Sequence, residues 1–146
     1  MRAEADGLTW LDRGECLRLL ASVPVGRLIF TMNALPTVRV VNFAVVDDLV
    51  LVRTAADTTM ASKVHGAIVS FEADELDAAT RSGWSVTVTG LAELVTDSAA
   101  VARYQEIPLV PWAPGVRDQF ITITTEILDG LRIARQQPPA AHPASA

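Results

Sequence analysis

The sequence predicts a mostly β protein, a small antiparallel barrel of about six strands with an N-terminal helix and two short helices. Three strand-like runs follow one another between Gly26 and Thr54 with only short turns between them, which is typical of an antiparallel meander. The segment from Trp84 to Leu94 alternates apolar and polar residues, the period of a strand with one buried face. The chain has 146 residues. This length suits one domain, expected over 1–135.

Composition excludes several classes of function. The net charge of -5 argues against general nucleic-acid binding, which needs a basic surface, so an anionic ligand requires a local cationic pocket. A single cysteine allows no intramolecular disulfide and no cysteine metal cluster. The first residues lack the apolar core of a signal peptide, and no apolar run reaches membrane-spanning length. We therefore expect a cytoplasmic protein without a membrane or nucleic-acid partner and without a bound metal.

The N-terminal part is expected to be a loose arm over residues 1–10, followed by a helix. Asp12 is suited to cap that helix, with Glu15 three residues later completing a capping box. Pro24 and Gly26 are expected to end it. The helix presents one apolar face, on which the cysteine is a core residue rather than a nucleophile: Cys16, Leu19, Leu20 and Val23.

The first half of the barrel is expected to be three strands. They are Gly26 to Thr31, Thr37 to Val46, and Leu49 to Thr54, with Asp47 and Asp48 forming a tight hairpin turn. On the middle strand two faces alternate. One carries Val38, Val40, Asn42 and Ala44, and the other carries Thr37, Arg39, Val41 and Phe43.

The middle of the chain continues this pattern. We expect a short helix from Thr58 to His65, a strand from Ala67 to Ala73, and then a solvated acidic connector from Asp74 to Gly83. The long alternating strand follows, and Gly90 inside it predicts a bulge or a close backbone approach.

The last third should hold a helix, a loop and the closing strands. The helix begins near Asp97 and reaches Tyr104. Three prolines make Ile107 to Gly115 a stiff loop, which carries Trp112. Gln119 to Thr125 and Leu128 to Ile133 are expected to close the sheet, and 136–146 to be a disordered tail.

The stretch from Leu49 to Val64 has the composition of a phosphate-binding site. A strand ends at Arg53 and Thr54, a small polar loop follows, and Ser62 and Lys63 lie on the next helix. Cationic groups, hydroxyls and free helix N–H groups together bind phosphate. The alternative is an ordinary solvated loop, because the glycines of a P-loop are absent.

Four segments in order resemble the FMN-binding split-barrel family of pyridoxamine 5'-phosphate oxidase-like proteins. They are PTVRVVNF, VLVRTA, ASKV and WSVTVTGLAEL, and the resemblance extends over roughly Leu11 to Ile133. The opening segment LDRGECLRLLASVPVGRLIF resembles the entry of small actinobacterial members. The resemblance implies a split barrel and a homodimer with flavin at the subunit interface. Trp112 could then be a wall of the partner's site.

The resemblance also assigns roles to single residues. Arg39 resembles the strand arginine that faces the FMN phosphate or ribityl chain, and Thr54 the threonine on the phosphate side. Ser62 and Lys63 resemble the phosphate-binding helix start. The remaining matches lie beside the ring system: the backbone of Val41 and Asn42 at the flavin edge, and Ser85 with neighbouring Trp84 at the isoalloxazine.

The sequence departs from the family at two of these points. The arginine between serine and lysine is absent, and Ser85 stands where the family often has glutamine. The arginine–histidine pair that pyridoxamine phosphate oxidases use on substrate has no match. We therefore expect a flavin-dependent oxidoreductase acting on a small molecule, in which FMN carries the reaction and no side chain is a required catalyst. The alternatives are a deazaflavin-dependent reductase on the same fold and a non-enzymatic protein that binds flavin, heme or a metabolite.

Overall fold

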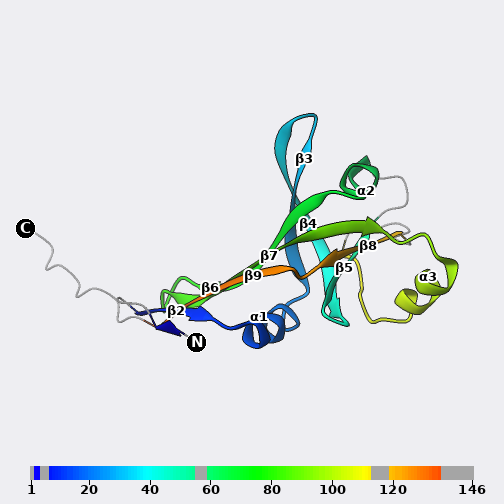
Figure 1. Cartoon of the computed structure of the whole chain (residues 1–146). Helices are drawn as coiled ribbons and strands as arrows, with labels where there is room; N and C mark the ends of the chain where they lie inside the picture. Colours follow the sequence, from blue (N-terminus) through cyan, green and yellow to red (C-terminus); the bar gives the residue numbers. More distant parts are fainter. Residues whose placement is uncertain (1, 4–6, 55–58, 113–118, 136–146) are drawn as a thin grey trace, which may run out of the picture.

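The computed structural model describes residues 2–3, 7–54, 59–112 and 119–135. Its elements alternate strands with three short helices (Figure 1). In chain order they are β1 (Arg2–Ala3), β2 (Leu8–Leu11), α1 (Arg13–Leu20), β3 (Val25–Met32), β4 (Leu35–Val46), β5 (Leu49–Thr54), α2 (Thr59–Val64), β6 (Ile68–Asp77), β7 (Ser82–Leu94), α3 (Ser98–Gln105), β8 (Gln119–Thr124) and β9 (Ile127–Ile133).

Six of these strands close into an antiparallel barrel. Strand β3 pairs with β4, β4 with β5 and β5 with β8, and β8 then pairs with β7, β7 with β6 and β6 with β3. Strands β9, β2 and β1 extend the sheet outward from β7. The mostly β six-stranded split barrel predicted from the sequence is therefore confirmed, with three further strands in the described part of the chain.

The barrel splits where β7 changes partners. Its residues 83–89 pair with β9, and Ala92 to Leu94 pair with β8. Between these runs two residues of β7 lie opposite residues 124–126, which makes a bulge. A Cβ on Gly90 would collide with the carbonyl oxygen of Thr124, so the expected close backbone approach is confirmed. The Leu91 N–H donates to Thr124 Oγ1 over 2.9 Å at the same point.

A buried threonine fixes the corner between β8 and β9. Arg13 donates to the Thr125 carbonyl and to Thr125 Oγ1, both over 2.7 Å, and that hydroxyl donates to the Asp48 carbonyl over 2.7 Å. These bonds join α1, the β4–β5 turn and the corner between β8 and β9.

Both turns of the first meander are tight two-residue turns. Asn33 and Ala34 join β3 to β4, and Asp47 and Asp48 join β4 to β5, all with positive φ. Two consecutive residues with φ > 0 make a turn whose twist matches that of the strands. The first turn is shorter than the sequence predicted, so β4 begins at Leu35 instead of Thr37.

The helices cover the open parts of the barrel. Asp12 Oδ1 caps α1 by accepting from the Glu15 N–H over 2.9 Å, as predicted. Cys16, Leu19 and Leu20 enter the main core, and burial raises the pKa of the Cys16 thiol, which confirms a core residue. Helix α3, capped by Asp97, covers a second, smaller core. That core contains Leu51, Tyr104, Leu109 and Phe120.

Two predictions about loops are wrong. Residues 8–11 are not a loose arm, because β2 pairs along β9 from Leu8↔Ile133 to Leu11↔Gly130. Most of the predicted acidic connector is a continuation of the β6–β7 hairpin, paired as far as Asp77↔Ser82. The acidic residues of this segment are strand residues at an exposed sheet edge, where their side chains can remain in solvent. The predicted tail lies outside the described residues.

Candidate functional site

A hollow of about 550 Å³ lies between α2 and a projecting hairpin of β3 and β4. The hairpin, here called the arm, consists of residues 30–41, and Figure 1 shows it extending beyond the rest of the sheet. Its strands pair mainly with each other, since β6 contacts β3 only from Arg27 to Ile29. The hollow is lined by Phe30, Met32, Asn33, Arg39, Val40, Val41, Thr54, Thr59 and Met60.

Strand alternation brings three of the predicted site residues to this hollow. Arg39 and Val41 point to the same side of β4, since they are two residues apart, and Thr54 ends β5 beside them. Phe30, Met32 and Met60 supply most of the apolar wall. The hollow thus combines an apolar wall with one guanidinium and two threonine hydroxyls.

Thr54 is the most unusual residue of the lining. It is 8% exposed, yet its hydroxyl makes no hydrogen bond with any residue that the structure describes. A buried hydroxyl without a partner is destabilising by about 1–3 kcal/mol. Its position at the wall suggests that a ligand atom completes its hydrogen bonding.

The charge of the hollow is positive. Arg39 is exposed, and its only hydrogen bond with a described residue goes to the carbonyl of Val38 over 3.1 Å. Arg39 makes no ion pair with any residue that the structure describes. Among the described residues no carboxylate lies in the lining, where the polar groups that could meet a bound anion are the Arg39 guanidinium, the Asn33 amide and two threonine hydroxyls.

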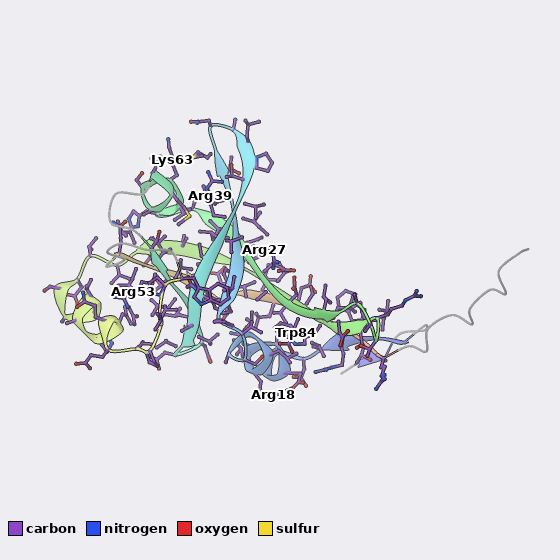
Figure 2. All side chains as sticks on the ribbon, turned by 180° about the vertical axis from the view of Figure 1, so that it is seen from behind. Arg18, Arg27, Arg39, Arg53, Lys63 and Trp84 are labelled. Atoms are coloured by element: carbon purple, nitrogen blue, oxygen red, sulfur yellow. The ribbon has the colours of Figure 1, made fainter. Side chains whose placement is uncertain are left out.

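Ser62 and Lys63 lie on α2 outside the lining. Both side chains are exposed, and Ser62 Oγ donates to the Thr59 carbonyl over 2.9 Å, which occupies it locally. Lys63 is the single lysine of the chain and makes no ion pair with a described residue. Figure 2 shows Lys63 and Arg39 at the same end of the molecule, near α2 and the arm. The predicted loop residues 55–58 lie outside the described residues.

Asn42 points away from the hollow. It follows Val41 on β4 and so faces the other side of the strand, where its Oδ1 accepts from the Trp112 backbone N–H over 2.9 Å. Its Nδ2 donates to the Pro24 carbonyl over 3.5 Å. The side chain therefore holds the loop that carries exposed Trp112, while the predicted contact of the Asn42 backbone with a ring stays a prediction.

Trp84 and Ser85 are not brought to the arm hollow within one chain. Trp84 is buried on the inner face of β7 and lines a second hollow of about 630 Å³ near Arg132, on the side of α1 in Figure 2. Ser85 is its strand neighbour and lies on the opposite, outer face. Their predicted contact with the same ring stays a prediction.

Several lining residues were missed from the sequence. Phe30 lies in a predicted strand, Met32 and Asn33 in its predicted turn, and Met60 on the predicted short helix, and none of them was expected at a ligand site. Nothing in the sequence shows that β3 and β4 continue beyond the barrel, because the alternation of an arm strand equals that of a barrel strand. No group of three potential metal ligands and no helix of membrane-spanning length occurs in the described ranges.

The family model described as pyridoxamine 5'-phosphate oxidase matches residues 12–137. The chain belongs to this family. The match includes the whole barrel, both sides of the arm hollow and all eight predicted site residues, so the family resemblance read from four short segments is confirmed.

One curated relative and two solved structures are similar to this chain. The chain is 48% identical over 128 residues to the uncharacterized protein Rv0080 of Mycobacterium tuberculosis, covering 84% of each chain. It is 35% identical to the FAD binding protein from Mycobacterium smegmatis, with a TM-score of 0.76, covering 88% of this chain and 100% of that one. A conserved protein of unknown function from Corynebacterium diphtheriae is 28% identical with a TM-score of 0.72, covering 88% and 100%.

Proposed function

We propose that this protein binds a flavin nucleotide in the arm hollow and acts as an oxidoreductase on a small molecule. The observation that carries the proposal is the buried hydroxyl of Thr54, which has no hydrogen-bond partner among the described residues and lies with Arg39 in the lining of a largely apolar hollow. The 35% identical relative named as FAD binding supports the same cofactor class.

The residues of the hollow fit such a cofactor. Its volume of about 550 Å³ lies within the roughly 300–1,000 Å³ usual for cofactor sites. Arg39 and Thr54 would hold a phosphate or the hydroxyl chain beside it, and Lys63 would add charge from α2. Phe30, Met32 and Met60 provide apolar surface for a ring and keep water from it.

A bound flavin supplies hydride or electron transfer, and the protein orients it and limits solvent access. FMN is the cofactor that the family resemblance implies, and FAD is the one in the name of the relative. FMN and FAD contain the same ring, ribityl chain and first phosphate. The arm hollow would bind this common part of the two cofactors. Deazaflavin and heme are the competing ligands.

We also propose that the protein is a homodimer. The outer face of the sheet, which points away from the barrel interior, exposes apolar side chains: Val40 is 70% exposed, Ile127 60% and Val38 54%. An isolated two-stranded hairpin such as the arm is only marginally stable in water, and a second copy would cover it. The outer face is formed by Val38, Val40, Arg27, Ile29, Ser70, Glu72, Thr87, Thr89 and Ile127, which pair across adjacent strands.

Titration with FMN, FAD and deazaflavin, followed by flavin and tryptophan fluorescence, tests the ligand. Arg39→Met and Lys63→Met should each weaken flavin binding roughly tenfold to 100-fold, because a charge-assisted hydrogen bond contributes about 1.5–3 kcal/mol. Thr54→Val should weaken it about tenfold, the effect of one neutral hydrogen bond.

Arg103→Met is the matched control, because this exposed arginine of α3 packs on Tyr104 away from the hollow. It should leave flavin affinity unchanged. A wild-type protein that binds none of the three cofactors, or an Arg39→Met variant with wild-type affinity, would contradict the proposal. A Soret band in the purified protein would support the heme alternative.

A further inference from the structure

Three charged side chains occupy the middle of the outer face. Arg27 of β3 lies opposite Glu72 of β6, and Asp74 follows on the same side of β6. One guanidinium nitrogen, Arg27 Nη1, contacts Glu72 Oε1 over 3.1 Å and Asp74 Oδ2 over 3.2 Å. Two carboxyl groups thus share one cation, and the cluster has a net charge of -1 when both are ionised.

Within the described ranges, no cation other than Arg27 pairs with this cluster. On β7 the residues opposite the two acids are Thr87 and Ser85, and both are neutral. On β4 the residue opposite Arg27 is Val40. The nearest further charge across the sheet is another carboxylate, Asp129 of β9, opposite Thr87. Helix α1 packs its apolar residues into the core.

The cluster is surrounded by the apolar part of the outer face. The adjacent row of cross-strand partners is Val38, Ile29, Ser70, Thr89 and Ile127, three of which are aliphatic. A two-fold contact through this face would bring each cluster into the interface with its counterpart, because such interfaces use the same surface on both copies. Two clusters of like charge would then lose solvent together, which is costly.

We propose that two copies associate through the outer face with Glu72 protonated, so that pH controls the dimer. The inference rests on the homodimer of the proposed function. Protonation removes the net charge of each cluster and lets Arg27 pair with Asp74 alone, while the aliphatic row makes the contact. Association therefore takes up one proton per copy, and the dimer strengthens as the pH falls.

In the single chain, the pKa of Glu72 already lies in the pH range that this proposal requires. Burial raises the pKa of Glu72 to about 7, helped by the hydrogen bond that protonated Glu72 donates to the neighbouring Asp74 carboxylate and opposed by Arg27. Two protons taken up per dimer then make the dissociation constant about 100-fold larger at pH 8 than at pH 6.

Analytical ultracentrifugation of the full chain from pH 6 to pH 8 tests this. The wild type should show the 100-fold change, and Glu72→Gln should dimerise with nearly the same affinity at every pH. Asp74→Asn should move the transition to lower pH, because it removes the neighbour that raises the pKa of Glu72. Glu106→Gln at the C-cap of α3, outside this face, is the control and should keep the wild-type profile.

The outcomes separate the two proposals. A dimer with the same affinity from pH 6 to pH 8 would overturn control by Glu72 and leave the dimer intact. A protein that is monomeric at pH 6 would overturn both, while flavin titration of the same sample would report separately on the cofactor. If Glu72→Gln does not fold by circular dichroism, the shift of the Asp74→Asn profile decides the inference.

Discussion

Replacing Gly90 with alanine should be among the most destabilising single-methyl changes in this protein. The added Cβ would lie 2.6 Å from Thr124 Oγ1, 2.7 Å from the Thr124 carbonyl carbon and closer still to its oxygen. Ordinary contacts begin at 3.4 Å, so strand β8 would have to move by most of an ångström or more. The obstacle is backbone, held on its other side by β5, and it cannot rotate away.

The cost has two parts. Overpacking against a rigid neighbour destabilises by about 1–3 kcal/mol. Separation of the strands also breaks the Leu91–Thr124 hydrogen bond, which contributes about 1 kcal/mol. A loss of about 3 kcal/mol in the free energy of unfolding lowers the Tm of a domain of this size by about 10 °C.

Thermal and urea unfolding followed by circular dichroism measure the effect. The matched control is Gly14→Ala in α1, where the added Cβ would be 3.7 Å from its nearest neighbour, Asp12 Oδ1. This variant should be more stable than wild type by about 0.5–1 kcal/mol, because glycine is a poor helix residue. A Gly90→Ala protein whose Tm falls by less than about 3 °C would refute the reasoning about the bulge.

Three further predictions concern single side chains. Thr125→Val should lower the free energy of unfolding by about 2–3 kcal/mol, because it removes the hydroxyl that accepts from Arg13 Nη2 and donates to the Asp48 carbonyl, while the bond from Arg13 Nη1 to the Thr125 carbonyl remains; urea unfolding measures this, and a loss below about 0.5 kcal/mol would contradict it. Because the folded-state pKa of Glu72 is about 7 against 4.5 in the unfolded chain, its contribution to stability is full below pH 4.5 and disappears as the pH rises through 7. Glu72→Gln should therefore gain stability relative to wild type at pH 8 compared with pH 4, and parallel pH profiles in urea would show the reasoning to be wrong. Asn42→Leu should release the Trp112 loop and shift tryptophan emission, which acrylamide quenching can follow; unchanged quenching would show that the hydrogen bond does not hold the loop.

Much of the fold was readable because its signals are local. Strand alternation from Trp84 onward, the Asp12 cap and the Asp47–Asp48 turn each depend on neighbours within a few residues. Strand β2 was not readable, since four residues, LTWL, form a strand only by pairing with β9 more than 110 residues away. The acidic half of β6 was missed because Asp74 compensates its poor strand preference through Arg27, again a distant contact.

The candidate site was readable in part for the same reason. The family resemblance assigned Arg39, Val41 and Thr54 to the site, alternation placed Arg39 and Val41 on one face of their strand, and the structure brings all three to one hollow. Trp84 and Ser85 could not be placed, because consecutive strand residues face opposite sides and the sequence does not say which side meets a ligand. The arm could not be predicted, since only three-dimensional pairing shows where β3 and β4 leave the barrel.

The order of the strands sets the timing of barrel closure during synthesis. Strand β8 pairs with both β5 and β7, and β9 pairs with both β7 and β2, yet they are the last two strands of the described chain. A nascent polypeptide therefore carries the open edges of β5 and β7 until residue 133 has left the ribosome. Such late, long-range pairing makes folding slow and leaves those edges available to chaperones or to aggregation until closure.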